Sequence, residues 1–191
     1  MVKAKAIKVI GGQFRGRSLH SVPGESTRPP LARVRGAVAN ILAGYVDGAR
    51  VLDLFAGTGS YSIELISRGA LSATCIDKNP KAVETIRRNL ISLGIESRVR
   101  LITGDATRVI GVLEKSEDPY QIILVAPPYF TGLDEETMDL LGRSPLVDPA
   151  GIVVLQQHRK ERHEENWGSL ALNRTYSYGD TRISTYLAAS A

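Results

Sequence analysis

The sequence has little cysteine and no long apolar run. Cys75 is the only cysteine among the 191 residues, which excludes an internal disulfide framework and a zinc site built from several cysteines. It lies in the run SATCID, residues 72–77, where we expect a small buried strand residue. No apolar run approaches the roughly 20 residues of a membrane span, and the run MVKAKAIKVIGG lacks the apolar core of a secretory signal. We therefore expect a cytoplasmic protein with no membrane partner.

A metal-binding pattern is absent too. The three histidines, His20, His158 and His163, are scattered, and none belongs to an HxxxH or Cys–His spacing. The run HRKERHEEN, residues 158–166, is typical of a solvated, charge-mixed loop or helix face. We therefore expect no bound metal.

Positive charge is concentrated at the N-terminal end. Residues 1–35 contain eight Lys and Arg and the single acid Glu25, a surplus of +7. Because the whole chain carries +4, the remaining residues sum to −3. Such an uneven distribution indicates a surface that contacts nucleic acid. The alternative is a solvated basic edge.

From residue 51 onward, short apolar runs alternate with helical patterns. The apolar runs occupy residues 51–55, 72–77, 99–104, 122–125 and 151–156. Apolar residues at three- and four-residue spacing predict helices at 60–67, from 80, at 106–113 and at 134–141, after a first helix from Arg33 to Gly48. This alternation predicts an α/β fold, a parallel sheet with helices on both faces. Two extended runs around Gly179-Asp180 predict a closing antiparallel hairpin.

The first 30 residues differ from the rest. The run AIKVIGGQFRGRSLHSV begins with apolar residues, continues with Gly11-Gly12 and then alternates, which is typical of a hairpin-like appendage. The run ESTRPP is a turn-forming linker. We therefore divide the chain into a basic N-terminal hairpin extension, residues 1–30, and one α/β domain, residues 31–191.

A glycine loop follows the first strand of that domain. In DLFAGTGSYS, residues 53–62, Gly57 and Gly59 let the backbone approach a ligand at the start of the next helix. A bare GxG is a weak signal. Ser62 replaces the third glycine of the dinucleotide fingerprint, which argues against a pyrophosphate ligand.

Three acids follow successive strands. Asp53 ends the first strand, Asp77 lies 18 residues beyond Gly59, and Asp105 follows the third strand. An acid at such a distance from the glycines typically binds ribose hydroxyls. Three carboxylates repel a pyrophosphate but suit a cationic, ribose-bearing ligand such as S-adenosylmethionine. The alternative is that each Asp caps a helix.

The run VAPPYF, residues 125–130, follows an expected strand at Tyr120–Val125. Pro127 and Pro128 fit neither a helix nor a central strand, so they predict a rigid turn. The turn would expose Tyr129 at the carboxyl end of the strand.

Several runs together resemble one family. GGQFRGRSL, RVRGAVANIL, VLDLFAGTGS, SRGA, GDA, PPY and YGDTRISTY are similar to the bacterial 16S ribosomal RNA guanine-N2 methyltransferases, the RsmD family, from about Ile7 to Tyr186. The resemblance implies a Rossmann-like class I S-adenosylmethionine methyltransferase with a mostly parallel seven-stranded sheet. It makes residues 31–191 the methyltransferase domain, ribosomal RNA (free or within the small subunit) the partner, and a monomer the expected state.

The resemblance also implies a set of site residues. Cofactor-binding positions are Asp53, Phe55, Ala56, Gly57, Thr58, Gly59, Asp77, Lys78, Asp105 and Ala106. The RNA-binding arginines are Arg15, Arg17, Arg28, Arg33 and Arg35, and the catalytic loop is Ala126, Pro127, Pro128 and Tyr129. Tyr129 would stack on a flipped base.

Ala126 departs from the family pattern. Relatives have Asp or Asn there, whose side chain accepts a hydrogen bond from the target amine, and they often have an acid where this chain has Gln156-Gln157. Three explanations are open. The chain belongs to an active branch of the family in which another residue accepts this hydrogen bond, it is an RNA- and cofactor-binding homologue without activity, or the alanine is an introduced lesion. A small-molecule methyltransferase is the remaining alternative.

Overall fold

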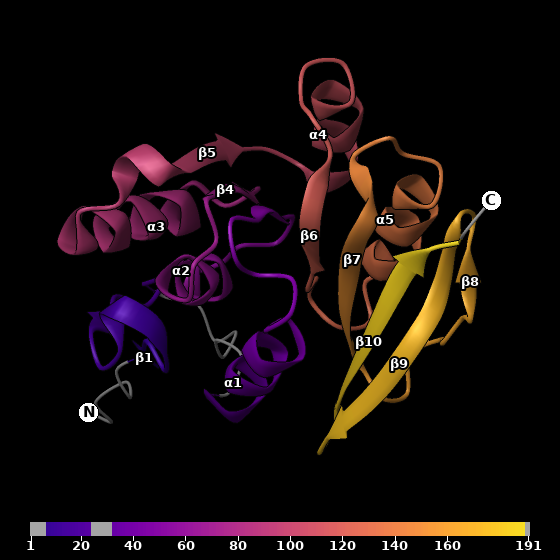
Figure 1. Cartoon of the computed structure of the whole chain (residues 1–191), viewed down its shortest axis with the longest axis horizontal. Coiled ribbons are helices and arrows are strands. Elements are labelled where there is room, and N and C mark those ends of the chain that lie inside the picture. The colour runs from indigo at the N-terminus through magenta and orange to yellow at the C-terminus, as the bar shows by residue number, and fades with distance from the viewer. Residues whose placement is uncertain (1–6, 24–31, 190–191) are drawn as a thin grey trace.

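An eight-stranded sheet forms the centre of the computed structural model, which describes residues 7–23 and 32–189 (Figure 1). Across the sheet the strands are β5 (Val99–Thr103), β4 (Ser72–Asp77), β3 (Arg50–Asp53), β6 (Tyr120–Val125), β7 (Val147–His158), β10 (Thr181–Ala188), β9 (Leu170–Tyr178) and β8 (Asn166–Trp167). The first five are parallel, and β10 is antiparallel to both β7 and β9. The predicted parallel sheet with a closing hairpin is confirmed.

Helices cover both faces of the sheet. On one face lie α1 (Ala32–Ile41), α2 (Ser60–Ser67) and α3 (Pro80–Leu93), and on the other lie α4 (Ala106–Leu113) and α5 (Leu133–Leu141). Because side chains alternate along a strand, Val51 packs toward the first group and Leu52 toward the second. Two apolar cores therefore hold the sheet from both sides.

Two elements differ from the expected pattern. The sheet has one strand more than the expected seven, because Trp167 is buried against the α4–α5 side and brings Asn166–Trp167 beside β9. The first helix ends at Ile41 rather than at Gly48, since turns occupy the residues that follow. In the described part of the chain, no helix is both long enough and apolar enough to cross a membrane.

The N-terminal segment forms the expected small hairpin, β1 (Ile7–Lys8) and β2 (Ser18–Leu19), with a short 3-10 turn η1 (Gly12–Phe14) between its strands. It docks on α2 through the buried Glu64, whose carboxylate accepts hydrogen bonds from the N–H of Ile10 at 2.7 Å and of Gly11 at 2.8 Å. The expected boundary between residues 30 and 31 lies outside the described residues.

Candidate active site

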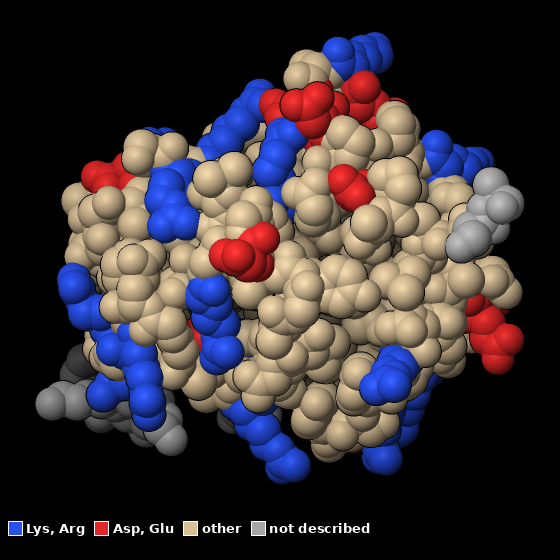
Figure 2. Space-filling view, in the orientation of Figure 1, with Lys and Arg blue, Asp and Glu red and all other residues tan. Residues whose placement is uncertain are grey.

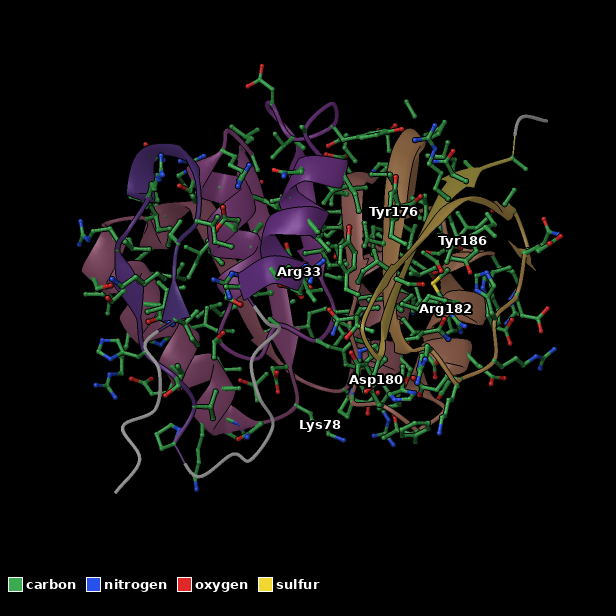
Figure 3. The ribbon with its side chains drawn as sticks, turned by 90° about the horizontal axis from the view of Figure 1, so that it is seen from below. Arg33, Lys78, Tyr176, Asp180, Arg182 and Tyr186 are labelled. Carbon is green, nitrogen blue, oxygen red and sulfur yellow. The ribbon has the colours of Figure 1, made fainter. Side chains whose placement is uncertain are left out.

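The carboxyl ends of the parallel strands meet at one edge of the sheet. β10 points upward in Figure 1 and is antiparallel to β7, so the carboxyl end of β7 lies low in that view, whereas the β5 arrow points toward the centre. Figure 3 looks onto this edge from below, with Arg33 on α1, Lys78 after β4, and Asp180 and Arg182 beside the β9–β10 turn. Open α/β sheets bind their ligands at this edge.

The glycine loop after β3 has a shape that suits glycine alone. Gly57 and Gly59 have φ of 55° and 72°, in the left-handed region. A Cβ on Gly59 would lie 3.0 Å from the side chain of Ile86, whereas a Cβ on Gly57 would meet no atom within 4 Å. The loop is therefore closed against the protein at Gly59 and open at Gly57, where a ligand has room to approach.

Asp77 holds the open part of this loop. Its Oδ2 accepts a hydrogen bond from Gly57 N–H at 2.8 Å, and its Oδ1 accepts one from Asn79 N–H at 2.8 Å. Each carboxylate oxygen has a second lone pair. Asp77 thus fixes the loop and keeps capacity to accept a ligand hydroxyl, while the neighbouring Lys78 is exposed.

Asp53 lies beneath the loop. It is 1% exposed, and its Oδ2 accepts a hydrogen bond from the Ser62 hydroxyl at 2.8 Å. Burial raises the pKa of Asp53 to about 7, against the effect of the Ser62 hydrogen bond, and the charge of Asp77 raises it further. Burial of Asp53 therefore favours the protonated form of this carboxyl group.

The remaining predicted cofactor residues flank the same edge. Asp105 caps α4, since its Oδ1 accepts hydrogen bonds from the Thr107 hydroxyl at 2.7 Å and from Thr107 N–H at 3.1 Å, which lower the pKa of Asp105. A capping role and a ligand role are compatible, because a second carboxylate oxygen remains. Three further residues of the glycine loop and one after Asp105 are half-buried or buried: Phe55, Ala56, Thr58 and Ala106.

The PPY loop continues from β6 at this edge. Ala126 packs against the core on the α1–α3 side, and Pro127 is buried while Pro128 is exposed. The Thr131 hydroxyl donates to the Pro128 carbonyl at 2.8 Å, which closes the turn. The structure confirms that this segment is neither helix nor strand.

A chain of hydrogen bonds fixes the hydroxyl of Tyr129. The Tyr61 hydroxyl donates to Gln156 Oε1 at 2.6 Å, and Gln156 Nε2 donates to the Tyr129 hydroxyl at 3.3 Å. The Tyr129 and Thr181 hydroxyl oxygens lie 3.0 Å apart. Sequence reasoning singled out Tyr129 and noted Gln156, but it missed Tyr61 and Thr181, which only the packing of α2 and the strand register bring here.

The residue after Tyr129 also bears on the site. Phe130 is 66% exposed and, among the described residues, is the one non-glycine with a positive φ, 60°. Glu161 accepts the Phe130 N–H, and the His158 ring lies 4.8 Å from the Phe130 ring. Strained backbone of this kind clusters at functional sites. The run 158–166 is a loop in part, as expected, but it also holds the PPY loop in place.

Three of the predicted RNA-binding arginines lie at the surface. Arg15 and Arg33 are exposed, and Arg17 reaches the carboxyl end of α3, where it donates to the Ser92 carbonyl at 2.6 Å. Figure 2 shows Lys and Arg over the hairpin and α3 and also at the top, the right and the bottom of the view, with Asp and Glu most numerous near α4. The hairpin that carries Arg15 and Arg17 thus packs on the same face of the sheet as α2 and α3.

Arg35 and Arg28 are placed differently from the other three. Arg35 is 2% exposed and donates to the Lys8 carbonyl, so it joins α1 to the hairpin. Arg28 lies outside the described residues. Within the described ranges, no group of three or more His, Cys, Asp and Glu is arranged to hold a metal ion.

Comparisons with known proteins agree with this arrangement. Residues 7–187 match the family described as Conserved hypothetical protein 95. The chain is 33% identical to the putative rRNA methyltransferase YlbH of Bacillus subtilis, over 94% of this chain and 98% of the relative. It is 36% identical to ribosomal RNA small subunit methyltransferase D of Escherichia coli, over 71% of this chain and 66% of the relative. The solved structure of the putative methyltransferase yhhF from Escherichia coli superposes with a TM-score of 0.83 at 29% identity, covering 98% of this chain and all of that one.

Proposed function

Because the chain belongs to the RsmD family, described as Conserved hypothetical protein 95, we propose that it methylates the exocyclic N2 amine of a guanosine in 16S ribosomal RNA, with S-adenosylmethionine as methyl donor. One observation carries the proposal. The open glycine loop, held by Asp77, and the PPY loop with its fixed Tyr129 lie at the same edge of the sheet. A donor at the first loop and a planar base at the second would thus lie side by side.

The residues around the glycine loop suit this cofactor. Gly57 leaves room for a ligand, and Asp77 has lone pairs for the ribose hydroxyls. We assign the adenine to Asp105 and Ala106, and the cationic end to the side of Asp53. When bound, S-adenosylmethionine supplies an electrophilic methyl group, whose C–S bond breaks as the C–N bond forms, with loss of one amine proton to solvent.

The PPY loop would orient the base. The Tyr129 ring, held at its hydroxyl by Gln156 and Thr181, provides a flat face for a guanine extruded from its stack. The Pro127 carbonyl would accept one hydrogen from the amine, and the rigid prolines keep that carbonyl in place. A base–aromatic stack contributes about 1–3 kcal/mol.

The basic surface would bind the ribosomal RNA. Arg15, Arg17 and Arg33 lie on the hairpin and at the start of α1, and all three are exposed. Phosphate contacts of this kind position the substrate without reading its sequence. Arg28 and Arg35 stay assigned to this surface as predictions, Arg35 through the hairpin that it anchors.

Cofactor binding is tested by calorimetry with S-adenosylhomocysteine. We expect Asp77→Ala to weaken binding at least about tenfold, because both the ribose partner and the anchor of Gly57 are lost. Asp139→Ala, an exposed residue of α5, is the matched control and should bind like the parent chain. Binding of NADH by the parent chain, without binding of the homocysteine nucleoside, would contradict the proposed cofactor.

Methyl transfer is tested with isotope-labelled donor on three acceptors. These are the small ribosomal subunit and its free 16S RNA, both from a strain that lacks the gene, and free guanosine. We expect label in ribosomal RNA, and a loss of most of it in Tyr129→Ala. Transfer to free guanosine alone would favour a small-molecule methyltransferase. Cofactor and RNA binding without transfer would favour an inactive homologue.

A further inference from the structure

The proposed function leaves the place of the amine acceptor open, since Ala126 has no polar side chain. Building on that function, we propose that the carboxamide oxygen of Gln156 accepts the hydrogen bond from the target amine. Gln156 of β7 would then be a catalytic residue, because it provides the hydrogen-bond acceptor that Ala126 lacks.

Strand register places the two side chains next to each other. Val125 of β6 pairs with Leu155 of the parallel strand β7, so Ala126, directly after β6, lies beside Gln156, which is two residues before the end of β7. Residues in register on parallel strands point to the same face of a sheet. Both line one small cavity of about 10 Å³, which Tyr61 of α2 lines as well. The long glutamine thus lies beside the space that a longer residue at 126 would occupy.

The hydrogen bonds fix which end of the carboxamide faces which neighbour. The Tyr61 hydroxyl lies 2.6 Å from the carboxamide oxygen Oε1 and donates to it. This distance is typical of an O–H···O hydrogen bond and is shorter than usual for N–H···O. The amide nitrogen then faces the Tyr129 hydroxyl at 3.3 Å. A carbonyl oxygen accepts two hydrogen bonds, so one lone pair of Oε1 is left for a substrate.

A neutral acceptor fits the chemistry of an aromatic amine. The lone pair of guanine N2 is delocalised into the ring, and an acceptor on one N–H helps to turn that lone pair toward the methyl group. The acceptor need not take the proton, which becomes acidic only after the C–N bond has formed and then passes to water. A neutral carboxamide oxygen can therefore accept this hydrogen bond and orient the amine.

The test is a set of single-turnover rates on one RNA substrate with labelled donor. Gln156→Leu should lower the rate by about 10²–10³, the loss typical of one positioned polar group, with little change in affinity for S-adenosylhomocysteine. Ala126→Asn alone should also be slower than the parent, because the cavity has too little room for the added amide. In the double variant the shorter Leu side chain no longer reaches the space beside residue 126, and we expect at least about a tenfold recovery over Gln156→Leu.

A control separates acceptance of the amine from support of Tyr129. Thr181→Val removes the other hydrogen-bond partner of the Tyr129 hydroxyl and should lower the rate less than tenfold. An equal loss in Thr181→Val and Gln156→Leu, or no recovery in the double variant, would overturn the acceptor role. A parent without activity beside an active Ala126→Asn would also overturn it, while leaving the proposed function intact. Only if both are inactive on every RNA does the proposed function itself fail.

Discussion

Alanine substitutions at Gly57 and Gly59 test the description of the glycine loop. The first should mainly weaken cofactor binding, and the second should mainly lower folding stability. Both have a positive φ, so alanine at either position costs about 1–2 kcal/mol of folding free energy. At Gly57 nothing is added to that cost, since no atom lies within 4 Å of the new Cβ. At Gly59 the new Cβ lies 3.0 Å from Ile86 on α3, a buried side chain. Overpacking of this kind costs about 1–3 kcal/mol more.

The two variants should therefore separate stability from cofactor binding. Urea unfolding should show a loss of about 1–2 kcal/mol for Gly57→Ala and about 2–5 kcal/mol for Gly59→Ala. Calorimetry at a temperature where both are folded should show the opposite order for S-adenosylhomocysteine. Gly57→Ala should lose at least about tenfold in affinity, because its methyl group projects into the space left for the ligand. Equal losses of stability, or unchanged binding in Gly57→Ala, would refute this description of the loop.

Two further predictions concern charge. Burial raises the pKa of Asp53 to about 7, so its contribution to stability is fully present below pH 4 and is lost as the pH rises through 7. Asp53→Asn should therefore flatten the pH dependence of the free energy of unfolding between pH 5 and 8 by roughly 3 kcal/mol. The same pH dependence in the parent chain and the variant would contradict this prediction. Replacing Arg15 and Arg17 by Gln should reduce the slope of log affinity against log salt for 16S RNA by up to about 2, whereas the same loss of charge at Lys115 and Arg143, on the α4–α5 side, should leave it unchanged.

The order of strands and helices could be predicted from the sequence because each element carries its own pattern. The runs at Ser72–Asp77 and Ala106–Leu113 have the bounds that periodicity predicted. The two loops of the site could also be predicted, because glycine and proline restrict or free the backbone at their own positions, whatever the rest of the chain does. β8 escaped prediction because two residues carry no periodicity, and its pairing depends on where Trp167 is buried.

The contacts that complete the site could not be predicted, because they join residues far apart in the sequence. The bond from Tyr61 to Gln156 spans 95 residues and depends on the packing of α2 on the sheet. Glu64 binds the backbone of the hairpin 53 and 54 residues away, a role that its place in an apolar helix pattern does not reveal. Charge counting likewise could not distinguish the exposed Arg33 from Arg35, whose position one half-turn further along α1 is buried.

The central claim is that this chain methylates a guanosine of 16S ribosomal RNA at N2, and mass spectrometry of nucleosides from that RNA tests it most directly. The RNA would come from a strain lacking the gene and from the same strain carrying either this sequence or its Tyr129→Ala variant. The account predicts an N2-methylguanosine that is missing without the gene, present with this sequence and strongly reduced with the variant. Identical nucleoside profiles in all three strains, for a protein that binds both S-adenosylhomocysteine and the RNA, would contradict it.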